Sequence, residues 1–150
     1  MPQSLTKNYI HIVFSTKNRQ KFIDDALAPE LYAYLGGICK NLECNPVKIG
    51  GHKDHVHILC LLSKKVALVH LLEKVKSHSS KWAKTRGDKY RNFYWQAGYG
   101  VFSVSYTAVD VVTQYIENQA THHSKKSFKD EYLAFLIENH IDFDERYVWD

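Results

Sequence analysis

Residues 47–62, VKIGGHKDHVHILCLL, contain the pattern from which the rest of the fold can be worked out. Apolar and β-branched residues predict strands at 47–50 and at 55–62, and Gly51-His52-Lys53-Asp54 predicts the turn that joins them. These two segments are therefore expected to form a hairpin. Both faces of the second strand become apolar towards its end, which predicts that the sheet is covered on both sides.

The sequence on either side of this hairpin predicts further strands and helices. We expect a strand at 9–16, a helix that begins after Asp24 or Asp25 and ends before Asn45-Pro46, a helix at 66–84, a long aromatic strand at 93–105, a helix from Thr107 or Asp110 to about His122, and a helix at 128–139 whose capping box is Ser127 with Asp130. Right-handed crossovers would place the first and third strands at the centre of a four-stranded antiparallel sheet. The expected fold is an α+β, ferredoxin-like βαββαβ sandwich with additional C-terminal helices.

The composition is that of a folded protein. Of the 150 residues, 45% are hydrophobic and 24% are charged, which argues against a disordered chain. We expect one domain over residues 1–150, because the chain has no internal repeat or low-complexity linker. The longest apolar runs are only strand-sized, and residues 1–8 lack the apolar stretch of a signal peptide. We therefore expect a cytoplasmic protein without a membrane partner.

The net charge of +4 permits a polyanionic partner but does not require one. The three cysteines, an odd number without CxxC spacing, are best interpreted as buried reduced thiols.

The first candidate for chemistry is the pair His55 and His57. Alternate residues of a strand point to the same face, so two imidazoles at this spacing can converge on one cation. The HxH pattern alone is weak, because two ordinary histidines near a strand end would look the same. Asp54, which directly precedes the pair, could orient one imidazole.

The second candidate is Tyr115 with Gln119. On a helix, residues four positions apart lie on the same face, and a glutamine carbonyl is a hard oxygen suited to Mg²⁺ or Mn²⁺. The alternative is a half-buried tyrosine beside a solvated glutamine. If the first two helices cover one face of the sheet, the Tyr115 helix is left for the face that carries the histidines. That arrangement would bring all four side chains together.

In combination these stretches resemble the single-tyrosine HUH transposases, the small transposases of bacterial insertion sequences and their relatives associated with repetitive extragenic palindromes. The matching stretches occur in the family order over nearly the whole chain: His11-Ile12-Val13-Phe14 with Lys17 and Arg19, Asp54-His55-Val56-His57-Ile58-Leu59, Lys74-Val75-Lys76-Ser77, and Tyr115-Ile116-Glu117-Asn118-Gln119.

The resemblance implies a role for each matching residue. His55, His57 and Gln119 would hold the metal, expected to be Mg²⁺ or Mn²⁺, and Tyr115 would be the nucleophile. The family acts as a homodimer on single-stranded DNA folded into hairpins at element ends, and its tyrosine forms a 5′-phosphotyrosine link. The resemblance also implies activity near the nucleoid of a bacterial or archaeal cell.

Basic residues provide candidates for DNA binding. We expect contacts from Lys17, Arg19, Lys74, Lys76, Lys81, Lys84 and Arg86, and Trp82 or Tyr94 could stack on bases. The alternative is that these lysines form a solvated helix face. For Trp82, a place in the core is the preferred interpretation. His122 and His123 could approach the DNA backbone, although a simple surface role is the simpler interpretation.

Three other functions fit parts of the sequence. A non-catalytic nucleic-acid-binding module could share the sheet topology, but the aromatic-glycine strand segments that RNA-binding domains use are missing. A domesticated relative that nicks repetitive palindromes would look the same. A zinc hydrolase would need a third strong ligand, and Gln119 is a poor ligand for zinc.

Overall fold

The fold is described by a computed structural model over residues 2–123 and 126–150. It contains the four strands β1 (Tyr9–Ser15), β2 (Pro46–His52), β3 (His55–Leu61) and β4 (Gly100–Val104). Its helices are α1 (Ala28–Asn41), α2 (Leu68–Lys84), α3 (Val109–Glu117), α4 (Gln119–His123) and α5 (Phe128–Glu138), and its 3-10 turns are η1 (Lys17–Arg19), η2 (Asp88–Tyr90) and η3 (Tyr106–Ala108). None of the described helices is both long enough and apolar enough to cross a membrane.

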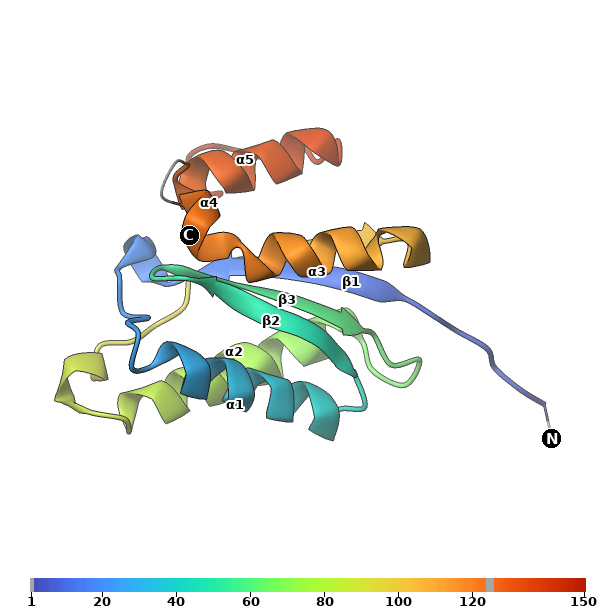
Figure 1. Cartoon of the computed structure of the whole chain (residues 1–150), viewed down its shortest axis with the longest axis horizontal. Coiled ribbons are helices and arrows are strands. Elements are labelled where there is room, and N and C mark those ends of the chain that lie inside the picture. The colour runs from blue at the N-terminus through green and yellow to red at the C-terminus, as the bar shows by residue number, and fades with distance from the viewer. Residues whose placement is uncertain (1, 124–125) are drawn as a thin grey trace.

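The strands form one antiparallel sheet in the order β2-β3-β1-β4. This confirms the ferredoxin-like sandwich, with the first and third strands at the centre. Helices α1 and α2 cover one face, and α3, α4 and α5 lie on the other (Figure 1).

Alternation along the strands separates two hydrophobic clusters. Ile12 of β1 and Ile58 of β3 point into the larger cluster, beneath α1 and α2. Val13 points the opposite way and packs with Phe102, Phe128, Tyr132 and Leu136 in a smaller cluster under α5. His55 and His57 are buried on this second face, because they alternate with Val56 and Ile58.

The last strand is shorter than the expected aromatic strand at 93–105. Only residues 100–104 form β4, while Trp95 makes an isolated bridge to Thr16. Phe93 and Trp95 are buried instead, with the Trp95 ring centroid 4.8 Å from those of both Phe93 and Phe14. The aromatic run that predicted a strand therefore fills the core beside β1.

The helix expected from Thr107 or Asp110 to about His122 is also divided. α3 ends at Glu117, Asn118 has φ −93° and ψ 17°, and α4 starts at Gln119. Asparagine favours such helix ends, because its side chain competes for backbone hydrogen bonds. Tyr115 and Gln119 thus lie on consecutive helices, although Gln119 Nε2 still donates to the Tyr115 carbonyl over 3.4 Å.

Gly50 allows α3 to approach the sheet closely. A Cβ atom at this position would lie 2.9 Å from Ile116 Cγ2 and 3.1 Å from the Ile116 carbonyl oxygen. The absence of a side chain therefore lets the helix rest on β2, with Tyr115 and Gln119 on either side of the contact residue.

Candidate active site

The two histidines of β3 present the same ring nitrogen to one point. His55 Nδ1 donates to Asp54 Oδ1 over 2.7 Å, as expected from the sequence, and His57 Nδ1 lies 2.8 Å from His11 Nε2. With these outer nitrogens engaged, both Nε2 atoms face the space between β3, α4 and α5. Both side chains are fully buried.

Two oxygen-bearing side chains meet these nitrogens. Gln119 Oε1 lies 2.8 Å from His55 Nε2. Glu131 Oε1, from α5, lies 3.1 Å from His57 Nε2 and 3.4 Å from His55 Nε2. The Gln119 amide is oriented by its own nitrogen, which donates to Glu131 Oε2 over 3.2 Å.

This arrangement suits a cation. When His55 donates from Nδ1 in its neutral form, its Nε2 atom carries a lone pair directed at the Gln119 carbonyl oxygen. Lone pairs this close repel unless a proton or a metal ion lies between them. His55, His57 and Glu131 form the one group of three potential histidine, cysteine or carboxylate ligands found among the described residues.

His11 is buried behind His57 and contacts the outer nitrogen of its ring. It lies on β1, and its ring stacks on that of His57 with centroids 5.0 Å apart. Burial and the proximity of His57 lower the pKa of His11 to about 3, although the Glu131 carboxylate opposes this shift. A neutral His11 can accept the Nδ1 proton of His57, which leaves His57 Nε2 unprotonated.

Tyr115 lies beside this group, half-buried on α3. Its hydroxyl donates to Glu131 Oε2, and its ring centroid lies 5.7 Å from that of His57. Burial and the neighbouring Glu131 carboxylate raise the pKa of Tyr115 above its ordinary value. The hydroxyl is therefore protonated at neutral pH, and any reaction as a nucleophile must remove that proton.

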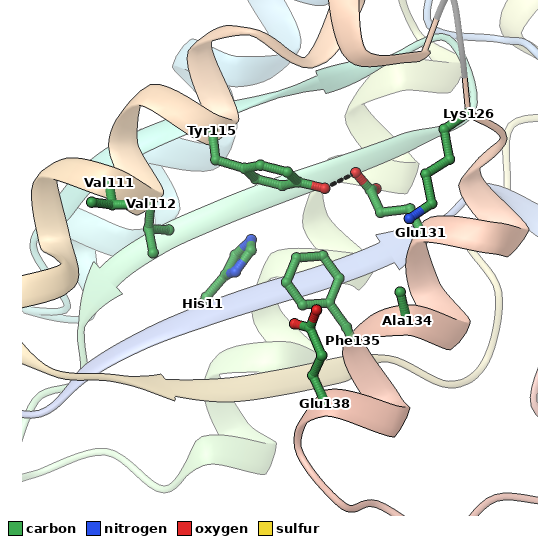
Figure 2. Close-up of a pocket in the computed structure, with 9 residues that line it drawn as sticks. All are labelled: His11, Val111, Val112, Tyr115, Lys126, Glu131, Ala134, Phe135 and Glu138. Carbon is green, nitrogen blue, oxygen red and sulfur yellow. Dashed lines mark hydrogen bonds between the residues drawn. The ribbon is translucent and has the colours of Figure 1, made fainter.

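A pocket of about 270 Å³ opens between α3 and α5 next to this hydroxyl. Figure 2 shows Tyr115 and Phe135 in its wall, with the tyrosine hydroxyl pointing towards Glu131. Lys126, from the segment before α5, also lines it. The nucleophile candidate is thus reachable from the surface while the histidines behind it are buried.

The structure brings together all four residues that the sequence singled out and adds Glu131 and Lys126. It also places at the site His11, which the sequence matched to the family without giving it a role. Glu131 could have been noticed only as an acid in the first turn of α5, where such residues are common helix stabilisers. His11 is a polar residue within an apolar strand, which is a usable signal. Glu131 also overturns the argument that a zinc site would lack a third strong ligand.

Most of the expected DNA-binding residues lie away from this site. Lys74, Lys76, Lys81 and Lys84 belong to α2, and Arg86 follows it, on the opposite face of the sheet (Figure 1). The Lys76 ammonium donates to the carbonyls of Ala97 and Gly98, and burial lowers its pKa to about 8. Lys76 thus serves a structural contact in this conformation.

Lys84, Trp82 and Arg86, also expected to bind DNA or to stack on bases, contact other side chains of the protein. Lys84 Nζ donates to Ser80 Oγ and lies 3.9 Å from the ring centroid of the exposed Tyr94. Trp82 stacks on Tyr34 at the margin of the core, as the preferred interpretation has it. Arg86 pairs with Glu30 over 3.2 Å.

Lys17 and Arg19 are closer to the histidines. They form η1, directly after Thr16, whose backbone nitrogen donates to the Asp54 carbonyl oxygen over 2.8 Å. The side chains of His122 and His123 lie outside the part of the chain that the structure describes.

Two solved structures have a similar fold. A candidate transposase from Deinococcus radiodurans R1 superposes with a TM-score of 0.62 at 23% identity, over 79% of this chain and 98% of that chain. A REP-associated tyrosine transposase bound to a REP hairpin gives a TM-score of 0.59 at 9% identity, over 82% of this chain and 73% of that chain. Among curated proteins, no significant match was found.

The sequence comparison identifies the family. Residues 4–119 match the family described as "Transposase IS200 like". The match covers more than half of the chain, from before β1 to the first residue of α4, and it includes His55, His57, Tyr115 and Gln119. The chain therefore belongs to the IS200-like transposase family.

Proposed function

We propose that this transposase-family protein cleaves and rejoins single-stranded DNA through a covalent bond to Tyr115. The observation that carries the proposal is the position of the Tyr115 hydroxyl, which is bound to a carboxylate that also contacts both histidines. A tyrosine next to a candidate metal site can attack a phosphate held there.

His55, His57 and Gln119 would hold a divalent metal, Mg²⁺ or Mn²⁺, with Asp54 and His11 orienting the imidazoles. The buried Nε2 atoms and the Gln119 oxygen fit such an ion, because imidazole nitrogens and an amide oxygen are ligands for divalent metals and all three atoms face the same space. When bound, the ion would supply positive charge that polarises the phosphate and stabilises the charge that develops on it.

The reaction proposed for Tyr115 is a substitution at phosphorus. Its Oη atom bonds to the phosphorus and loses its proton, while the bond from phosphorus to the 3′ oxygen breaks. The 3′ oxygen takes a proton and leaves as a hydroxyl, and the phosphate stays on the 5′ side as a phosphotyrosine ester. Attack by another 3′-hydroxyl reverses the step and joins strands without ATP.

Single-stranded DNA hairpins are the proposed substrate. The REP-associated relative binds a hairpin, and the present chain has a similar fold and a net charge of +4. Lys17 and Arg19 could position the strand near the histidines, while Lys74, Lys81, Lys84 and Arg86 could bind a phosphate backbone on the far face. We propose that this happens at the nucleoid, in the cytoplasm of a bacterial or archaeal cell.

The proposal can be tested by trapping the covalent intermediate. A 3′-labelled single-stranded hairpin, incubated with the protein and Mn²⁺, should give a labelled adduct that migrates slowly on a denaturing gel. Tyr115→Phe should abolish the adduct, because only the hydroxyl is lost. Tyr106→Phe is a suitable control, since Tyr106 is an exposed tyrosine near the other end of α3.

Two results would contradict the assignment. An adduct that persists in Tyr115→Phe, or that maps to another tyrosine, would identify a different nucleophile. Cleavage by the wild type without any adduct would indicate water activated by a metal, as in a hydrolase.

A further inference from the structure

Glu131 occupies a position that the matched family segment does not explain. The match ends at residue 119, whereas Glu131 lies on α5, beyond it. Its side chain is only 1% exposed. An ionised carboxylate buried to this degree is costly unless opposite charge or hydrogen bonds compensate it.

The two carboxylate oxygens of Glu131 face different partners. Oε1 lies 3.1 Å from His57 Nε2 and 3.4 Å from His55 Nε2, which are the atoms proposed to hold the metal. Oε2 accepts from the Tyr115 hydroxyl and from Gln119 Nε2. One side chain therefore touches both the candidate metal ligands and the candidate nucleophile.

We infer that Glu131 is a fourth protein ligand of the metal through Oε1, and that it holds the Tyr115 hydroxyl through Oε2. This inference rests on the proposed function and adds α5 to the active site. A carboxylate gives a divalent ion the negative charge that two imidazoles and an amide lack. Because the same group binds the tyrosine, it sets the nucleophile at a defined place beside the ion.

The packing of aromatic rings on either side of Glu131 holds α5, and with it the Glu131 side chain, in a fixed position. The Phe128 ring, one turn earlier on α5, stacks on His55 with centroids 4.5 Å apart. Phe135, one turn later, lies with its ring centroid 5.3 Å from that of His11 and 5.8 Å from that of Tyr115. The residues before and after Glu131 thus seat α5 against the histidines and the tyrosine themselves.

The first test is metal affinity, measured by calorimetric titration of Mn²⁺ into the full chain without DNA. Glu131→Gln keeps the size of the side chain and removes its charge, so affinity should fall by about tenfold or more. Asp130→Asn is the matched control, because it removes an exposed acid from the adjacent position of the same helix. Thermal unfolding in chelator would check that both variants fold. Equal Mn²⁺ affinity of Glu131→Gln and the wild type would overturn the ligand assignment.

The second test separates the two roles. With Mn²⁺ at saturation for each protein, Glu131→Gln should still form the Tyr115 adduct about tenfold or more slowly, because the hydroxyl has lost its charged acceptor. A wild-type rate under these conditions would overturn that role. If the wild type gave no adduct while Glu131→Gln lost Mn²⁺ affinity, the proposed function would fail and the ligand assignment would stand.

Discussion

His57 Nδ1 lies 2.8 Å from His11 Nε2, and His55 Nδ1 lies 2.7 Å from Asp54 Oδ1. At the scale of single residues, these two contacts decide which nitrogen of each imidazole is available. A partner on Nδ1 leaves Nε2 as the atom that can bind a metal. The neighbours of the histidine pair thus determine whether the HxH pattern can act as a metal site.

This geometry predicts that binding and cleavage can be separated by one substitution. His57→Ala should abolish Mn²⁺-dependent cleavage and leave hairpin affinity largely intact, because the basic residues of α2 lie on the other face of the sheet. Electrophoretic mobility shift and cleavage assays on the same hairpin would measure both. His78→Ala, an exposed histidine of α2, should retain cleavage. Undiminished cleavage by His57→Ala or in excess chelator would refute the metal site.

At the scale of elements, the site depends on how closely α3 and α5 approach the sheet. Both helices pack over a glycine: Gly50 of β2 lies under Ile116, and Gly100 of β4 lies under Tyr132. A Cβ atom at Gly100 would lie 3.0 Å from Cε1 of the Tyr132 ring. These close contacts hold α3 and α5 near the sheet, where side chains of β3, α3 and α4 meet Glu131.

Substitution of Gly50 tests that dependence. Gly50→Ala should lower the free energy of unfolding by about 1–3 kcal/mol, because the new methyl group would overlap Ile116. Gly37→Ala is the control, because a Cβ atom at Gly37 would meet no atom within 4 Å. This substitution should stabilise α1 by about 0.5–1 kcal/mol. Urea denaturation measures both changes. A Gly50→Ala protein as stable as the wild type would show that α3 can shift without cost.

At the scale of the whole molecule, the remaining question is how copies of the chain associate. We predict a homodimer, as the resemblance implies, although β4 is a shorter edge strand than the aromatic run suggested. An exposed edge of this kind can pair with that of a second copy. Sedimentation equilibrium should give about twice the 17.5 kDa of one chain. A mass of one chain at micromolar concentration would contradict the prediction.

The positions of the side chains also predict where each site is completed. Tyr115 lies next to the histidines of its own chain, with its hydroxyl on Glu131 of the same chain. A mixture of His57→Ala and Tyr115→Phe protomers should therefore stay inactive in the adduct assay. Recovery of activity on mixing would mean that the tyrosine serves the partner's histidines.

Local patterns in the sequence were sufficient for much of this fold. The two-residue period of a strand puts His55 and His57 on one face, whatever the rest of the chain does. Strand and helix order, with short connections, selects the central strands β1 and β3. The four-residue spacing of a helix placed Tyr115 and Gln119 side by side, and the two residues do lie in contact. This holds even though the helix expected to carry both is broken at Asn118.

Tertiary structure alone decided the rest of the site. Glu131 is 74 residues from His57 in the sequence, and no periodic pattern connects a helix N-terminal acid to a strand so far away. His11 could be noticed in its apolar strand, but its contact with His57 depends on the register in which β1 pairs with β3. Periodicity records which face of an element is buried, whereas the partner it meets there depends on packing between segments distant in the chain.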